Sequence, residues 1–331
     1  MKNLDTVIDS LVENKTVEHI AVRVGKGDRV LYDTFRGGVD EHTVFDMASI
    51  TKIMATTSLA YIALDKGLLS LDDRIDKFYG TDKSFTVKHL LTHTSGVGNK
   101  SLNKEGYTYD NIAEKILAFP LDYQTGTKVC YSCPGYILFA KVLEKVFGDR
   151  LDRCFYKYVA EPLGLTESTF LPKDKERIVN ANLSEAYRGR VNDYNSQYLG
   201  GVAGNAGLFS TLADVTKYIH FLLDSGRALF SKELFDLAVQ NHTPNMGNSR
   251  GLGFVYVDEG YKQSGGLLPV GTIGHCGHTG QSFFVDRNTG LYVIILSDAE
   301  ISVVKKYREE KYSEVMEMRR ALHEAIKNDM M

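Results

Sequence analysis

Apolar residues follow two different spacings along this chain, and the strand-like runs gather towards its two ends. Apolar positions three and four apart predict an amphipathic helix over residues 4–14. Strand-like runs at 19–24 and 29–36 follow, and the glycine-containing segment 25–28 between them predicts a hairpin turn. The chain is therefore expected to begin with a helix and a two-stranded hairpin.

Strand signals return only late in the sequence. Apolar runs rich in β-branched and aromatic residues predict strands at 253–257, 270–274, 282–286 and 291–296, with a tight turn between the last two. A charged amphipathic helix is predicted over 303–327.

Helical spacing dominates the middle of the chain. It predicts helices at 53–66, 71–75, 87–91, 107–118, 134–147 and 212–223. Gly67 and Gly148 are suited to close the helices that precede them, and Pro134 suits a first helical turn. Ser210 or Thr211 is the expected N-cap of the helix at 212–223.

Strands at both ends with helices between them predict an α+β fold. We expect one antiparallel sheet, built from both chain ends and flanked by helices, with a mostly helical region inserted. The predicted division is an α/β sheet domain formed by 1–75 and 181–331 and a helical region at 76–180. An active site is expected between them.

Composition excludes some classes of function. The 331 residues carry a formal net charge of -3 with 43% apolar residues, which gives no basic footprint for nucleic acid. No apolar run is long enough for a membrane span. Residues 1–5 lack the apolar core of a signal peptide, which predicts a cytoplasmic protein unless a leader once preceded this sequence. The sequence indicates no cofactor and no oligomeric state.

Ser49 and Lys52 are the first candidates for chemistry. A serine and a lysine three apart at the start of a helix lie on one face, where the amine can reach the hydroxyl. An adjacent base is the usual means of activating a serine nucleophile. Ser49 lies between an apolar lead-in and a strongly apolar helix, so we expect it to be half-buried at a helix mouth.

The same Ser-x-x-Lys spacing occurs at Ser101/Lys104 and at Ser302/Lys305. Ser101 lies in a polar segment typical of a loop, and Ser302 precedes a charged helix. For both pairs we therefore expect a solvated lysine and no catalytic role. The glycine-rich stretch 200–210 lacks the Gly-Lys-Ser/Thr ending of a phosphate loop and predicts a close-packed turn.

Three local motifs occur in a suggestive order. They are Ser49-Ile50-Thr51-Lys52, then Tyr131-Ser132-Cys133 at a helix start, then Gly274-His275-Cys276-Gly277-His278-Thr279-Gly280 entering a strand. In this order and spacing the chain resembles the penicillin-recognising serine hydrolases, which include class C β-lactamases, D,D-peptidases and family VIII esterases. Segments 90–96, 162–165 and 201–210 also resemble that family, so the resemblance covers nearly the whole chain. It implies a β-lactamase/transpeptidase-like fold.

The resemblance implies roles for these residues in a serine hydrolase that works through an acyl-enzyme. Ser49 is the nucleophile, Lys52 holds its hydroxyl and shares its proton, and Tyr131 passes a proton between nucleophile and leaving group. Lys52 as a cation would favour the phenolate of Tyr131. The substrate would be a small molecule or peptide: a β-lactam, a D-amino-acid peptide or an ester.

The third motif would supply the opposite wall of the cleft. Counting back from Asp286 places His275-Cys276-Gly277 at the family's Lys/His-Thr-Gly position, although His278-Thr279-Gly280 matches better as a string. His275 would then stabilise charge near Tyr131, and Gly277 would allow close backbone approach. The backbone N–H groups of Ser49 and His278 would form the oxyanion hole.

Two residues depart from the family pattern. Cys133 stands where the family usually has Asn, and Cys276 stands where it usually has Thr; both positions would contact the substrate. A thiol is a much poorer hydrogen-bonding group than an amide or a hydroxyl. These changes favour substrates without the usual carboxylate, or a weakened enzyme. Gln281, Asn205 and the loop 121–129 are expected to line the cleft.

Two other functions are possible alternatives to a serine hydrolase. The first is a binding protein, a sensor or scaffold that keeps the fold and has lost turnover through Cys133 and Cys276. The second is a metal-dependent hydrolase in which Cys130, Cys133, His275, Cys276 and His278 ring a soft-metal site. The sequence favours neither over the serine hydrolase, and a redox disulfide among these cysteines is a further reading.

Overall fold

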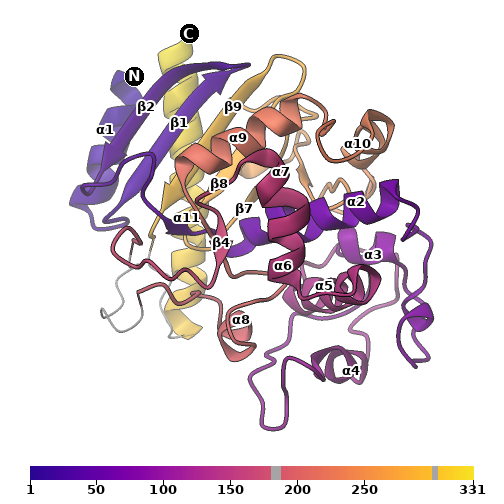
Figure 1. Cartoon of the computed structure of the whole chain (residues 1–331). Helices are drawn as coiled ribbons and strands as arrows, with labels where there is room; N and C mark the ends of the chain where they lie inside the picture. The colour runs from indigo at the N-terminus through magenta and orange to yellow at the C-terminus, as the bar shows by residue number, and fades with distance from the viewer. Residues whose placement is uncertain (180–187, 300–304) are drawn as a thin grey trace.

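A computed structural model describes residues 1–179, 188–299 and 305–331 of the chain, without the side chains of 305–312. The predicted domain boundary between 180 and 181, Ser302 and the predicted helix start at Val303 lie outside the described residues. Figure 1 shows the first and last parts of the chain combined in one sheet, with the middle of the chain packed beside it.

The main sheet contains six strands within the described residues, in the order β2-β1-β9-β8-β7-β6, and every neighbouring pair is antiparallel. The strands are β1 (Ile20–Lys26), β2 (Arg29–Arg36), β6 (Val255–Tyr256), β7 (Ile273–Cys276), β8 (Ser282–Val285) and β9 (Leu291–Ser297). Strand β1 pairs along its whole length with β9, with Val22 opposite Ile295. The antiparallel sheet assembled from both chain ends is confirmed.

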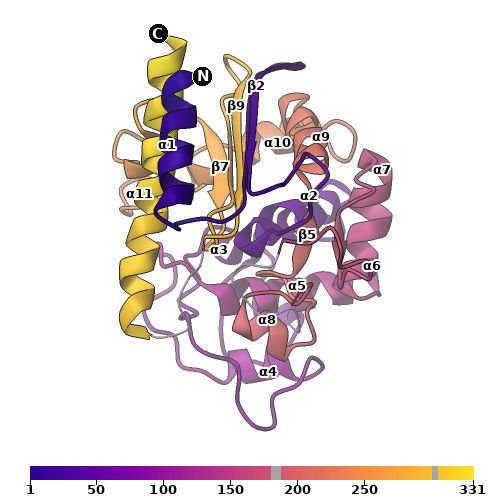
Figure 2. The same cartoon turned by 90° about the vertical axis from the view of Figure 1, so that its left-hand side faces the viewer.

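Two helices cover one face of this sheet. Helix α1 (Lys2–Glu13) and helix α11 (Lys305–Met330) lie side by side there, as Figure 2 shows. Leu4 and Leu322 of these helices share a buried cluster with Val22 and Ile295 of the sheet. Because side chains alternate along a strand, the neighbouring residues face the other side and join the larger core of the molecule.

The larger core is built by the helices of the middle segment and by α9 and α10. Their bounds are α2 (Ser58–Asp65), α3 (Val87–Leu91), α4 (Ile112–Leu117), α5 (Cys133–Phe147), α6 (Leu151–Phe155), α7 (Glu161–Leu163), α8 (Tyr194–Tyr198), α9 (Leu212–Leu223) and α10 (Lys232–Ala238). Short 3₁₀ turns occur at Ile75–Lys77 and Lys262–Ser264, and a π-helical turn at Tyr156–Ala160 joins α6 to α7. Gly148 closes α5 in the left-handed conformation, and the Thr211 side chain caps α9 by accepting from the N–H of Asp214, both as expected.

Some boundaries differ from the expectations. The helix predicted at 107–118 shrinks to α4, because its first residues form turns capped by Asn111 and Thr108. The strand predicted at 270–274 begins later, at Ile273, since a turn at Gly271 precedes it.

A second, three-stranded sheet was not predicted. It has the order β3-β5-β4, with strands β3 (Phe45–Asp46), β4 (Thr169–Phe170) and β5 (Leu208–Ser210). Strand β5 lies inside the glycine-rich stretch. Such short strands carry too few residues for a period to show in the sequence.

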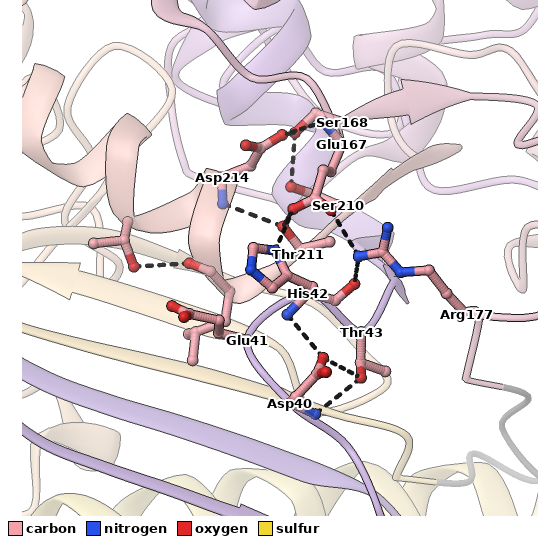
Figure 3. Close-up of polar contacts among 12 residues, drawn as sticks. Asp40, Glu41, His42, Thr43, Glu167, Ser168, Arg177, Ser210, Thr211 and Asp214 are labelled. Carbon is pink, nitrogen blue, oxygen red and sulfur yellow. Dashed lines mark hydrogen bonds and ion pairs between the residues drawn. The ribbon is translucent and has the colours of Figure 1, made fainter.

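Polar contacts around Glu167 hold the segments that enter this small sheet (Figure 3). The Glu167 carboxylate accepts from Arg177 at 2.6 Å and from Thr211 at 3.1 Å, and it lies 2.9 Å from the His42 ring. The fully buried Asp214 accepts from Ser168 at 2.9 Å. The chain leading to β3 is thereby tied to β4 and α9, directly before it reaches Ser49.

Candidate active site

Ser49 lies in a short, tightly wound segment between β3 and α2. A 3₁₀ turn spans Ala48–Ile50 and a π-helical stretch spans Lys52–Thr57, where a plain α-helix was expected. Ala48 has a φ of 44°, a strained value for a residue with a side chain, and its N–H donates to Asp46 at 2.8 Å. Such irregular helix is frequent at functional sites. Ser49 is half-buried, as predicted.

Two side chains meet at the Ser49 hydroxyl, one from the following helical turn and one from a distant segment. The Lys52 ammonium lies 2.9 Å from Ser49 Oγ, and the Tyr131 hydroxyl donates to the same oxygen at 2.7 Å. Lys52 is fully buried and also donates to the Asn205 carbonyl at 2.9 Å. Its nitrogen lies 4.8 Å from the ring centre of Tyr131. This arrangement suits proton transfer from the serine to a base.

His93 supports Tyr131 from behind. Its carbonyl accepts from the N–H of Cys130 at 2.9 Å, and its Nδ1 accepts from the N–H of Ser132 at 3.1 Å, so the residues on both sides of Tyr131 are held. The His93 and Tyr131 rings lie 4.6 Å apart. Burial lowers the pKa of His93 well below its usual value, which keeps the ring neutral and Nδ1 able to accept.

The third motif enters the site on β7 and the turn that follows it. Gly277 packs against the chain before Ser49: a Cβ added to it would lie 3.1 Å from the Ala48 side chain and 3.2 Å from the Met47 carbonyl. The His278 ring reaches Asn192, with 2.7 Å between Nε2 and Oδ1. The structure thus brings the turn that carries His278 against the segment that carries Ser49.

His275 lies beside Tyr131 in the wall of the site. It is buried, neither ring nitrogen has a hydrogen-bond partner, and its ring centre lies 6.2 Å from that of Tyr131. Burial, with added repulsion from Arg250 and Lys52, lowers the pKa of His275 well below its usual value. A neutral imidazole therefore lies near Tyr131, at the position where we expected His275 to stabilise charge.

Cys133 and Cys276, the cysteines that we expected at the family's Asn and Thr positions, have different surroundings. Cys133 opens α5 and its sulfur lies 3.6 Å from the Lys52 nitrogen, while the pKa of its thiol is raised by burial and partly lowered by Lys52. The Cys276 sulfur lies 3.6 Å from the Tyr261 hydroxyl. Cys276 lines the cavity beside Ser49, whereas Cys133 does not.

A cavity of about 450 Å³ opens beside Ser49. Its walls include Ser49, Tyr131, His275, Cys276, Gly277 and His278 together with two arginines, Arg250 and Arg319. The loop 121–129 contributes none of its lining, and neither do Asn205 and Gln281, which were expected there. Asn205 instead binds Lys52, and Gln281 braces the turn after β7 through the Ser297 carbonyl at 2.8 Å.

The sequence reasoning missed both arginines. The Cζ of Arg250 lies 5.9 Å from the ring centre of Tyr131, and its Nε and Nη1 are buried without a hydrogen-bond partner. No pattern in segment 249–253 indicated which way its side chain points. Arg319 did leave a signal, because it occupies a position between Val315 and Leu322 on the apolar stripe of the last helix.

The metal-site alternative finds no support in this arrangement. Across 1–179, 188–299 and 305–331, the one group of three or more His, Cys, Asp or Glu ligand atoms close together is Glu18, His19 and Asp298, far along the chain from the expected residues. The sulfur of Cys133 contacts Lys52 and that of Cys276 contacts Tyr261, so the two sulfurs have different neighbours. All four cysteines are free thiols, and no disulfide joins them.

Known proteins resemble this chain over most of its length. Residues 4–313 match the family model described as Beta-lactamase. A putative D-alanyl-D-alanine carboxypeptidase of Escherichia coli (strain K12) is 29% identical over 307 residues, which cover 79% of this chain and 70% of the relative. Esterase EstB of Burkholderia gladioli is 26% identical over 355 residues, covering 89% of each protein.

Solved structures share the fold at lower identity. EstCE1, a hydrolase with promiscuous acyltransferase activity, matches with a TM-score of 0.77 at 19% identity, covering 97% of this chain and 98% of that one. A β-lactamase from Mycobacterium bovis matches with a TM-score of 0.69 at 20% identity, covering 98% of both. The β-lactamase/transpeptidase-like fold is confirmed.

In the described parts of the chain, no helix combines the length and the apolar character needed to cross a membrane. The family model spans both ends of the main sheet and all three motifs that meet at Ser49. This chain therefore belongs to the β-lactamase family and is a serine hydrolase of the penicillin-recognising type, working through an acyl-enzyme.

Proposed function

We propose that Ser49 is the nucleophile and that the enzyme cleaves peptides ending in a D-amino acid with a free carboxylate. The observation that carries the nucleophile assignment is the position of Ser49 Oγ, 2.9 Å from the Lys52 nitrogen and 2.7 Å from the Tyr131 oxygen. Neither Ser101 nor any other serine in the described residues has both a lysine and a tyrosine bonded to its hydroxyl.

In the proposed reaction, Ser49 Oγ attacks the substrate carbonyl carbon while its proton passes to Tyr131 in its phenolate form, which the Lys52 ammonium stabilises. The carbonyl oxygen becomes an oxyanion, which the N–H groups of Ser49 and His278 stabilise. The Tyr131 hydroxyl then gives a proton to the leaving amine, and the C–N bond breaks to leave the acyl-enzyme. Water, activated by the same groups, releases the acyl group and restores Ser49.

The position of Arg250 favours a substrate that carries a negative charge. The guanidinium lines the same cavity as Ser49, and two of its nitrogens are buried without partners. A buried donor left unsatisfied is costly, and a carboxylate that pairs with it in the complex removes that cost. This proposal departs from the expectation drawn from Cys133 and Cys276, which favoured substrates without a carboxylate. The similarity to a putative D-alanyl-D-alanine carboxypeptidase supports a peptide.

The nucleophile is tested by intact-protein mass after incubation with a penicillin and, separately, with a reactive ester. We expect one acyl adduct on the wild type and on Ser101→Ala, the matched Ser-x-x-Lys control, and none on Ser49→Ala. An adduct that persists on Ser49→Ala would refute the assignment. Decay of the adduct over repeated turnovers distinguishes an enzyme from the non-turnover binding protein, in which the adduct would remain.

The substrate class is tested with two peptides that differ only in the C-terminal group, a free carboxylate or an amide. We expect the wild type to prefer the carboxylate by about 10- to 100-fold in kcat/KM, as for a charge-assisted hydrogen bond. Arg250→Met should remove most of that preference. Arg227→Met, at an exposed arginine paired with Asp224, should keep it. Equal rates for both peptides with the wild type would favour an esterase instead.

A further inference from the structure

Arg319 is an unusual residue for the inner face of a helix. It is 1% exposed and is the largest fully buried side chain of the described chain. Its neighbours on the same face of α11, among them Met318 and Leu322, pack against the main sheet. An arginine here must hold its positive charge in a poorly solvated place, which is unfavourable unless its donors are satisfied.

The partners of Arg319 are backbone carbonyls and an amide. Nη2 donates to the Gly277 carbonyl and to the Gln281 carbonyl, the latter at 3.2 Å, and Nη1 donates to Gln263 Oε1 at 3.2 Å. Among the residues described, no carboxylate forms an ion pair with it. Nη2 therefore binds the two carbonyls at the base of the turn that joins β7 to β8, while Nε is buried without a partner.

We propose that Arg319 is a positioning residue, which aims the backbone N–H of His278 at the reacting carbonyl oxygen. The Gly277 carbonyl and the His278 N–H belong to one peptide group, which is planar and trans, so the two point in opposite directions. A hydrogen-bond donor on α11 that holds the Gly277 carbonyl oxygen therefore also fixes the direction of the His278 N–H. It also polarises the peptide group and strengthens the N–H as a donor.

The surroundings of the turn agree with this role. On the side of the nucleophile, Gly277 lies so close to Met47 and Ala48 that a Cβ would be crowded. On the opposite side, Arg319 holds the carbonyls of Gly277 and Gln281. The Gly277 N–H donates to the Gln281 carbonyl at 2.7 Å, which closes the turn. The turn is thus clamped between the Ser49 segment and the guanidinium.

This inference rests on the proposed oxyanion hole of Ser49 and His278, so its experiment must separate the two. The wild type, Arg319→Met, Arg319→Lys and the control Arg320→Met are compared. Arg320 is the exposed neighbour, paired with Glu317 and Glu324 on the outer face of α11. Acylation is followed with an ester and with its thionoester, in which sulfur replaces the carbonyl oxygen and hydrogen-bonds poorly to the hole.

We expect Arg319→Met to slow acylation by the ester about 10- to 100-fold, somewhat less than loss of a whole oxyanion donor, with KM little changed. The ester-to-thionoester rate ratio should fall towards one, a change that loss of general stability would not cause. Arg319→Lys can still donate to one carbonyl and should recover part of both effects, and Arg320→Met should match the wild type.

The inference would be overturned if Arg319→Met were acylated as fast as the wild type and kept the same ester-to-thionoester rate ratio. If Arg319→Met fails to fold, an unchanged rate ratio in Arg319→Lys, which no longer bridges both carbonyls, would overturn it as well. A wild type that forms no Ser49-dependent adduct, or that treats ester and thionoester alike, would instead refute the proposed function.

Discussion

The Lys52 ammonium nitrogen lies 3.6 Å from the sulfur of Cys133, as the weakest of its three contacts. The other two, to Ser49 Oγ and to the Asn205 carbonyl, are both 2.9 Å long. A neutral thiol accepts a hydrogen bond poorly, so one of the three ammonium hydrogens is badly satisfied. Lys52 thus links Cys133 to Ser49, the proposed nucleophile.

Cys133→Asn should give Lys52 an amide oxygen and raise the rate of acylation about 10-fold, the effect of one hydrogen bond to a charged group. The measurement is the pre-steady-state rate of adduct formation with a penicillin and with a D-amino-acid peptide. Cys130→Asn serves as the control, since no hydrogen bond joins Cys130 to Lys52. An unchanged or slower rate in Cys133→Asn would show that this contact does not limit acylation.

Tyr131→Phe removes the hydroxyl that donates to Ser49 at 2.7 Å and leaves the ring in place. We expect kcat to fall about 10²- to 10⁴-fold, as for loss of a general acid–base group, with a much smaller change in KM. Steady-state kinetics on the preferred peptide measure both. Tyr156→Phe, at a tyrosine that is 62% exposed, should keep wild-type values. A fall of less than tenfold would mean that another group carries the proton.

Gly277→Ala tests the close approach of the third motif to Ser49. Its Cβ would lie 3.0 Å from Gln281 Oε1 and 3.1 Å from the Ala48 Cβ, so the turn must move by a few tenths of an ångström. Small displacements of a catalytic group are costly, and we expect kcat/KM to drop about 10- to 100-fold. Gly80→Ala has open space around its Cβ and should be neutral. Equal activity of the two variants would contradict the prediction.

His323 should make stability depend on pH. Burial lowers its pKa to about 4, while its Nδ1 donates to the Gln263 carbonyl at 2.7 Å. The unfolded chain, with an ordinary histidine pKa near 6.5, takes up a proton that the folded protein resists. The free energy of unfolding therefore falls as pH drops from about 6.5 towards 4, by roughly 2 kcal/mol from His323 between pH 7 and 5.

Urea unfolding of the wild type and His323→Gln at pH 7 and pH 5 measures this contribution. The variant should lose about 2 kcal/mol less than the wild type over that interval. Asp46 acts in the opposite sense, because burial raises its pKa to about 6 and its protonation stabilises the fold as pH falls. Asp46 is present in both proteins and cancels in the comparison. Equal losses in the two proteins would contradict a neutral, buried His323.

The sequence alone predicted the architecture well, because its signals are local. Helices and strands of five or more residues carry a period, and the first hairpin and α5 with its Gly148 end were read from it. The spacing of Ser49 and Lys52 on one turn of helix required no tertiary information, and the hydroxyl and amine do meet. The ordered motifs were sufficient to identify the family.

Tertiary structure alone decided the electrostatics and the fine geometry of the site. The charge of His275 depends on its burial and on two cations from distant segments, Arg250 and Lys52, so no local pattern reports it. The 3₁₀ turn around Ser49 begins at Ala48, whose N–H is held by Asp46 at the end of a strand of the small sheet. The position of Arg319 on an apolar stripe is a local signal, but its target, the Gly277 carbonyl, belongs to a turn more than forty residues away. Periodicity records which face of an element is buried; it does not record which distant group that face will meet.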